Sequence, residues 1–170
     1  MTPTMKYDAI IIGGGYAGMS KAEELQKNGL KCLVINKGVS LYGFSPEEFE
    51  RLGGTVLNGD EVVSACIQDN EVKSVSTSNL GSVRLEAGQF YLASGKFFAG
   101  GLKSDMDGIY EPVFGLDVEY EKDQSKWFAE KFSDDQPFMH FAVRTDAAGN
   151  ALKNGEPIKN LFPIGDIITK

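Results

Sequence analysis

The chain has 170 residues, 42% hydrophobic and 24% charged, and its 17 basic and 24 acidic side chains give a net charge of -7. That length suits one domain with a core of its own, and the acidic balance disfavours nucleic-acid binding and electrostatic attachment to anionic lipid, since both need a basic surface. With no apolar run near the roughly 20 residues that span a bilayer and no signal-peptide segment at the start, we expect a cytoplasmic protein without direct membrane insertion.

The first 36 residues predict a β-α-β unit. Residues 7–12 form an apolar, β-branched run that ends in three glycines, as a buried parallel strand does. Residues 17–28 have small and apolar side chains on one helical face, with Gly29 as a C-terminal stop. Residues 31–36 are the next apolar strand, and a right-handed crossover between the two strands follows.

The next segment predicts a short helix and then a meander. Ser45, Pro46 and the acids after them are typical of a helix start, and Gly53 and Gly54 end the helix. From residue 55 to 92 the pattern changes to alternating runs separated by turn-prone residues, which indicates an antiparallel meander; these runs are residues 61–68, 71–78 and 82–87.

The distal half returns to apolar strands. Residues 89–95 are a strand that leads into a small-residue turn, and residues 160–166 are a final buried strand. Between them the chain is irregular, with one helix expected around residues 125–132. The predicted fold is therefore α/β and Rossmann-like, with a parallel sheet, helices and an antiparallel β-meander.

The glycine-rich turn after the first strand is the strongest local motif. Its first glycine permits a tight turn, its third lets a phosphate approach the backbone, and the last lets helix and strand pack closely. The helix that follows directs its N–H groups at a bound anion. The motif thus predicts that the fold is a Rossmann-like FAD/NAD(P)-binding domain. The alternative is a purely structural turn. The candidate residues are Gly13, Gly14, Gly15, Tyr16, Ala17 and Gly18.

Asn36 stands where such folds usually carry an acid that binds the adenosine ribose. An amide accepts a hydroxyl as a neutral partner, so we expect ribose recognition to be weaker by about 1 kcal/mol. Lys37 could favour a further phosphate or be a solvated lysine.

Two distal stretches resemble the two-dinucleotide-binding-domain flavoproteins. "YLASGKFF" is similar to their "ATG" turn, and "NLFPIGD" to their terminal glycine-aspartate strand. The resemblance implies that Asp166 accepts a hydrogen bond from the flavin ribityl chain, unless it only caps a turn. Further candidate cofactor-binding residues are Val62, Ser94, Gly95, Lys96 and Gly165.

A narrower resemblance is carried by "ASGKFF-GGL" and "EPVFGLDV", together with the glycine-rich opening. These stretches are similar to the B subunit of the anaerobic glycerol-3-phosphate dehydrogenase. The resemblance implies oxidation of glycerol 3-phosphate to dihydroxyacetone phosphate, with FMN or FAD as cofactor. It also implies two partners: a flavoprotein dehydrogenase, known as the A subunit, and an iron–sulfur, membrane-anchoring C subunit that leads to quinone. These partners would place the protein at the inner membrane only peripherally.

The sequence departs from that family in two ways. Its members are longer, and the resemblance leaves out a large segment near residues 44–47, which would include the substrate domain. We also expect the helix that follows the terminal aspartate in the family to be absent. We therefore interpret residues 1–170 as one flavin-binding domain, and expect the chain alone not to oxidise glycerol 3-phosphate.

Several other residues are candidates with a plainer alternative. Lys96 could face the flavin ring or solvent, and Phe97 and Phe98 could stack near the ring or pack against the missing domain. His140 is more typical of a core residue than of a base, and Arg144 could touch an anion. Three further side chains, Cys32, Cys66 and Trp127, are expected to be buried packing residues. Neither a catalytic residue nor a metal site is identified.

Two other functions remain open at this point. One is a nucleotide-binding or assembly module without turnover, whose aromatic surface could drive self-association. The other is a nicotinamide-binding Rossmann domain, which the meander and the terminal "GD" disfavour.

Overall fold

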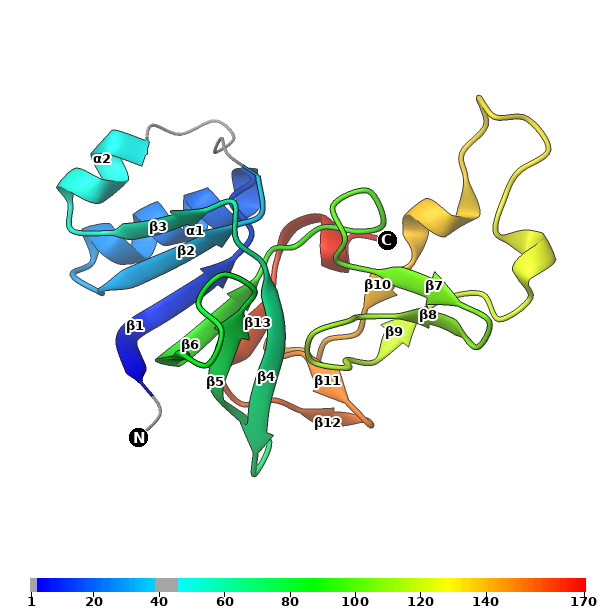
Figure 1. Cartoon of the computed structure of the whole chain (residues 1–170). Coiled ribbons are helices and arrows are strands. Elements are labelled where there is room, and N and C mark those ends of the chain that lie inside the picture. Colours follow the sequence, from blue (N-terminus) through cyan, green and yellow to red (C-terminus); the bar gives the residue numbers. More distant parts are fainter. Residues whose placement is uncertain (1–2, 39–45) are drawn as a thin grey trace.

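Seven strands form one sheet within the described residues, 3–38 and 46–170 of the computed structural model (Figure 1). Six strands follow the order β3-β2-β1-β6-β5-β4, and β13 also pairs with β6. The strands of this sheet are β1 (Thr4–Ile12), β2 (Cys32–Asn36), β3 (Thr55–Asn58), β4 (Val62–Gln68), β5 (Glu71–Thr77), β6 (Arg84–Leu92) and β13 (Leu161–Pro163).

Short strand pairs and helical turns make up the rest of the chain. The small strands are β7 (Lys103–Asp105), β8 (Gly108–Tyr110), β9 (Val118–Glu119), β10 (Ala142–Val143), β11 (Leu152–Lys153) and β12 (Glu156–Pro157). The helices are α1 (Tyr16–Lys27), α2 (Pro46–Arg51) and the 3-10 turns η1 (Gln124–Lys126), η2 (Pro137–His140) and η3 (Gly165–Ile168).

The predicted β-α-β unit is confirmed, and it continues by one more strand than predicted. β1 and β2 are parallel, with Ala9 opposite Cys32. β3 is also parallel to β2, so residues 55–58 belong to the parallel sheet and not to the meander. The reason is α2, which lies between β2 and β3 in the sequence and provides the crossover that a parallel connection needs. α2 begins at Pro46, as predicted; the proposed cap Ser45 lies outside the described residues.

β6 corrects the predicted meander. The sequence pattern predicts two strands at residues 82–87 and 89–95, but Arg84–Leu92 is one continuous strand. Its whole length pairs in parallel with β1, which keeps it extended past Gly88. On its other side it meets β5 in antiparallel fashion at Leu85 and β13 in parallel at its end. β6 therefore joins the parallel sheet to the antiparallel strands.

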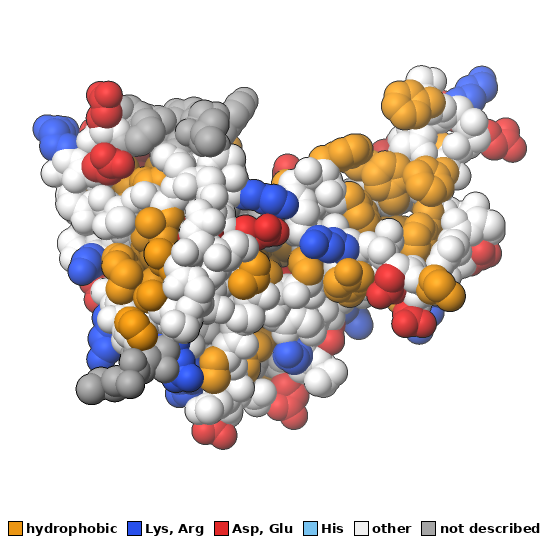
Figure 2. All heavy atoms as spheres, in the orientation of Figure 1, with side chains coloured by type: hydrophobic (Ala, Val, Ile, Leu, Met, Phe, Trp, Pro, Cys, Tyr) orange, Lys and Arg blue, Asp and Glu red, His pale blue; other side chains and the backbone are white. Residues whose placement is uncertain are grey.

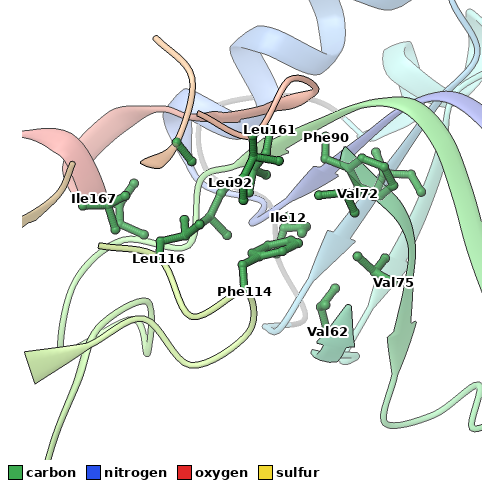
Figure 3. Close-up of a cluster of buried hydrophobic side chains, with 14 of the residues drawn as sticks. Ile12, Val62, Val72, Val75, Phe90, Leu92, Phe114, Leu116, Leu161 and Ile167 are labelled. Atoms are coloured by element: carbon green, nitrogen blue, oxygen red, sulfur yellow. The ribbon is translucent and has the colours of Figure 1, made fainter. Parts of the chain in front are cut away.

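The sheet has an apolar core on each face. Because side chains alternate along a strand, Ala9 and Ile11 point to one face and Ile10 and Ile12 to the other. The first face is covered by α1 and α2 through Met19, Ala22, Leu25 and Phe49. The second carries the larger cluster, which gathers side chains of β1, β4, β5, β6 and β13 with Phe114, Leu116 and Ile167 (Figure 3).

The helix predicted around residues 125–132 is wrong. Only η1 forms there, in an extension of the chain from residue 121 to 140 that we call the arm (Figure 1). The Gln136 side chain binds backbone groups that a helix would pair internally: it accepts from Ala129 N and donates to Lys131 O, both at 2.9 Å. An eight-residue helix is marginal in water unless it packs on something.

Two further side-chain predictions are corrected by local geometry. Cys66 is exposed, because the alternation along β4 directs Ala65 and Ile67 towards the core and Cys66 away from it. His140 is exposed and binds Asp135 through Nε2 at 2.7 Å. Residues three apart share one face of a 3-10 turn, so Phe138 and Phe141 pack inward while His140 points out. Cys32 is buried as predicted, and Trp127 packs partly buried on the core.

Candidate functional site

The glycine turn between β1 and α1 is fixed by two close backbone contacts. Gly13 has φ +115°, and a Cβ there would lie 2.1 Å from the carbonyl oxygen of Ala93. A Cβ on Gly18 would lie 2.0 Å from the carbonyl oxygen of Gly13. Both positions therefore need glycine for packing alone. A Cβ on Gly15, in contrast, would meet nothing within 4 Å.

The start of α1 has no side-chain cap. Its N-cap is Gly15, which makes no side-chain capping bond, and its first turn has no acidic residue. The first N–H groups of a helix have no intrahelical partner, and the helix dipole places partial positive charge there. A phosphate that reaches Gly15 meets open space and this positive end.

A cavity of about 900 Å³ lies at the carboxyl ends of β1, β2, β6 and β13. This is within the range of small-molecule sites, at the edge of a parallel sheet where such folds bind ligands. Figure 2 shows a hollow on this face with charged side chains of both signs around it. The cavity lining includes twelve predicted residues: Gly13, Gly14, Gly15, Tyr16, Ala17, Asn36, Lys37, Val62, Ser94, Gly95, Gly165 and Asp166.

At the β2 end of the cavity, the amide of Asn36 is already engaged. Its side chain is 7% exposed, and Nδ2 donates to Oδ1 of Asn58 at 3.0 Å. The carboxylate of Asp60, also buried, accepts from the N–H groups of Glu61 and Asn79 and so fixes the loop that follows β3. Lys37 lies 3.4 Å from Glu61 in an exposed ion pair, so its charge is already partly balanced.

At the other end, the terminal turn packs against the helix start. Gly165 has φ +76°, and a Cβ there would lie 2.7 Å from the Cβ of Ala17. This close approach brings Asp166 into the cavity lining. It also ends the predicted strand early: β13 stops at Pro163 and η3 begins at Gly165.

Two predicted site residues, Gly18 and Lys96, are not part of the cavity lining. Gly18 is packed beneath the glycine turn. The Lys96 ammonium group donates to the carbonyl oxygens of Met139 and Thr169, so it points away from the cavity. Burial lowers the pKa of Lys96, although the nearby Asp166 carboxylate acts in the opposite direction.

The three other candidates, Phe97, Phe98 and Arg144, differ in their position relative to the cavity. Phe98 lines the cavity and is 91% exposed, whereas Phe97 packs on the core against Phe138 at 5.8 Å between ring centroids. Arg144 is exposed and lies outside the cavity lining.

Glu111 is a cavity residue that the sequence pattern does not predict. It is 2% exposed, and burial raises the pKa of its carboxyl group while bonds from Val113, Phe114, Leu116 and Gly115 N–H groups act to lower it. The signal in the sequence is an acid in the apolar stretch "IYEPVF". Glu61 and Lys103 also line the cavity without having been predicted.

Two kinds of site are absent from residues 3–38 and 46–170. No helix there is long and apolar enough to cross a membrane. No group of three or more His, Cys, Asp or Glu side chains there could hold a metal ion.

Comparison with solved structures finds partial likenesses. A geranylgeranyl bacteriochlorophyll reductase-like protein from Thermoplasma acidophilum is 15% identical, with TM-score 0.47, over 54% of this chain and 40% of that one. Thioredoxin reductase from T. acidophilum is 18% identical, with TM-score 0.40, over 61% of this chain and 38% of that one.

Sequence comparison finds closer relatives. The B subunit of anaerobic glycerol-3-phosphate dehydrogenase from Aliivibrio fischeri (strain MJ11) is 36% identical over 92% of this chain and 38% of its own length. The protein of that name from Vibrio vulnificus (strain CMCP6) is 38% identical over 76% of this chain and 32% of its own length. The chain thus spans less than two fifths of the length of these relatives.

The family match covers nearly the whole chain. Residues 8–46 and 41–170 match the family described as FAD binding domain. The chain therefore belongs to the family of FAD binding domains, whose cofactor is a flavin, and it is similar in sequence to the B subunit of anaerobic glycerol-3-phosphate dehydrogenase.

Proposed function

We propose that the chain binds FAD in the cavity, with the cofactor's phosphates at the start of α1. The observation that carries this proposal is the uncapped helix start beside Gly15, where a Cβ would meet only open space. Gly13 and Gly18 hold the turn by contacts that tolerate no side chain. The residues present therefore fit a diphosphate.

The extent of the cavity supports FAD over FMN. Its lining extends from Asp166 to Asn36 and Val62. Asn36 and Val62 lie at the end of the cavity where an adenosine half would bind. We place the adenosine near Asn36, Lys37 and Val62. The flavin end is then near Ser94, Gly95 and Asp166.

The chain's own part is to bind and orient the cofactor. When bound, a flavin supplies the two-electron redox chemistry. The α1 N–H groups and the glycine turn would hold the phosphates, and Asp166 would accept a hydrogen bond from a cofactor hydroxyl. No residue is assigned as a catalytic base.

We further propose that this domain serves an oxidoreductase that acts on glycerol 3-phosphate. The support is the 36% identity to the B subunit of the A. fischeri enzyme over 92% of the chain. By the same resemblance, its partners would be a dehydrogenase of the A type and an iron–sulfur protein of the C type, which would hold it peripherally at a membrane. The two overlapping matched segments, 8–46 and 41–170, support a single cofactor domain with a substrate domain left out near residues 44–47.

A visible absorption spectrum of the desalted protein, after incubation with FAD, FMN or NADH, tests the cofactor proposal. Retention of FAD above the other two nucleotides is expected. Retention of FMN alone would remove the adenosine assignment, and preferential retention of NADH would favour a nicotinamide-binding domain instead. Loss of all three on desalting would contradict the proposal.

Self-association is a second candidate property, favoured by the exposed apolar side chains of the arm. Phe128 is 67% exposed, Phe132 is 99% exposed, and the arm shows a patch of hydrophobic side chains (Figure 2). A contiguous patch of this kind is typical of an interaction surface. Sedimentation of the protein and of a Phe128→Ser, Phe132→Ser variant tests it, with a monomer in both cases counting against the proposal.

A further inference from the structure

We propose that Glu111 is a positioning residue that fixes one wall of the cofactor cavity through its buried carboxylate. Glu111 directly follows β8, and it lines the cavity together with the next two residues, Pro112 and Val113. Its side chain is 2% exposed, so the carboxylate is a buried group directly behind the cavity surface.

The carboxylate organises the backbone of the turn that follows it. Oε2 accepts from the N–H of Val113 at 2.6 Å. Oε1 accepts from the N–H groups of Phe114 at 2.8 Å and Leu116 at 3.4 Å. A carboxylate has about four acceptor sites, so three of them hold one turn of backbone.

The same turn is anchored in the core from its other side. The side chains of Phe114 and Leu116 lie in the main apolar cluster with Ile12 and Val62 (Figure 3). Lys153 donates from Nζ to the carbonyl oxygen of Phe114 at 2.6 Å. With both ends held, Pro112 and Val113 have little freedom to leave the cavity wall.

Glutamine cannot replace this arrangement, although it has nearly the same shape. Val113 and Phe114 donate to different oxygens of the carboxylate. A glutamine has one acceptor oxygen and one NH₂ group, so one of these N–H groups would face another donor. A buried N–H group left without an acceptor is costly, and the turn is expected to move.

Asp117 provides a matched control in the same region. It too is a carboxylate that holds a turn, because it accepts from the N–H groups of Asn154 and Gly155 at 2.8 and 2.7 Å. It lies outside the cavity lining. Asp117→Asn should therefore weaken the fold without changing the cavity.

This inference rests on the proposed cofactor site, and the experiment separates the two. FAD titrations of the parent chain, Glu111→Gln and Asp117→Asn would be followed by flavin fluorescence and by visible circular dichroism of the bound flavin. Amide hydrogen exchange at Val113, Phe114 and Leu116 would be measured without flavin.

We expect Glu111→Gln to weaken FAD binding about tenfold, to alter the visible dichroism and to speed exchange at the three amides by more than its loss of overall stability accounts for, whereas Asp117→Asn should change neither the FAD affinity nor the dichroism. Equal FAD affinity and dichroism in parent and Glu111→Gln would overturn this inference alone. The same changes in Asp117→Asn would also overturn it, because the effect would then be general loosening. Failure of the parent chain to bind FAD would overturn the proposed function and this inference with it.

Discussion

Asn36 and Asn58 are register partners at the ends of β2 and β3, and their side chains are joined by a 3.0 Å hydrogen bond from Nδ2 of Asn36 to Oδ1 of Asn58. The bond holds the Asn36 amide at the edge of the cavity, in the position that usually carries an acid. The end of the cavity where we place the adenosine is thus built from a neutral pair of amides joined by one hydrogen bond.

Replacing Asn36 with aspartate should strengthen FAD binding several-fold. A charged acceptor is worth about 1 kcal/mol more than a neutral one to a ribose hydroxyl, and Asn58 can turn its amide to donate to the new carboxylate. Fluorescence titration with FAD and FMN checks this. FMN is the control, since it lacks the adenosine; an equal change for both cofactors would show that position 36 does not meet the ribose.

Two alanine substitutions in the glycine turn should have different effects. Gly15→Ala should leave the free energy of unfolding within about 0.5 kcal/mol, because φ there is -79° and the new methyl group meets nothing. It should nevertheless weaken FAD binding at least about tenfold, by occupying the space that a phosphate needs. Denaturant unfolding and FAD titration measure the two effects separately.

Gly18→Ala should instead destabilise the fold by about 1–3 kcal/mol, since its Cβ would press on the carbonyl oxygen of Gly13. Intact binding by Gly15→Ala, or unchanged stability of Gly18→Ala, would contradict the roles assigned to these glycines.

The buried Glu111 should give stability a distinctive pH dependence. Its pKa is raised by burial in the folded state, so the folded protein holds the proton more tightly than the unfolded chain does. The part of its contribution that depends on this proton is fully present below the ordinary glutamate pKa of about 4.3 and is lost as the pH rises through the raised pKa. The free energy of unfolding of the parent minus that of Glu111→Gln should therefore decline across this window. Urea titrations at a series of pH values measure this, and a flat difference would contradict it.

Lys96 should contribute to the stability of the fold and not to the environment of the cofactor. Its ammonium group joins the carbonyl oxygens of Met139 and Thr169, so Lys96→Met should lower the free energy of unfolding by about 1 kcal/mol and leave the spectrum of bound flavin unchanged. Lys103→Met removes a lysine that does line the cavity and is the control. A shifted flavin spectrum in Lys96→Met would show that this lysine faces the cofactor after all.

The β-α-β unit and the glycine turn were predictable because each depends on neighbours in the sequence. A β-branched run, three glycines and an amphipathic helix follow one another within residues 7–28, so local rules suffice. The same holds for α2, where Pro46 and two acids define the helix start.

The errors arose where side-chain contacts that the local sequence pattern does not encode decide the outcome. Gln136 binds the backbone of residues 129 and 131 and so takes the place of a helix. Lys96 is drawn to carbonyl groups 43 and 73 residues away in sequence. Glu111 is not predictable from such local rules, because an acid before a proline is typical of an exposed turn; in the structure it is buried where it binds the backbone of Phe114 and Leu116, whose side chains lie in the core.

The central position of β6 in the sheet affects how the protein folds. β6 pairs with β1, where Thr4 is opposite Arg84, and with β13, where Phe90 is opposite Leu161. Both pairings close long stretches of chain, which makes assembly slow compared with that of a helical protein of equal size. During synthesis, β1 can pair with β2 early, but its other edge must wait for about eighty residues to emerge before β6 exists, and β6 must wait for about seventy more before β13 does. Until then each presents an unpaired apolar edge, which is the state most open to aggregation and the one in which a chaperone would be most useful.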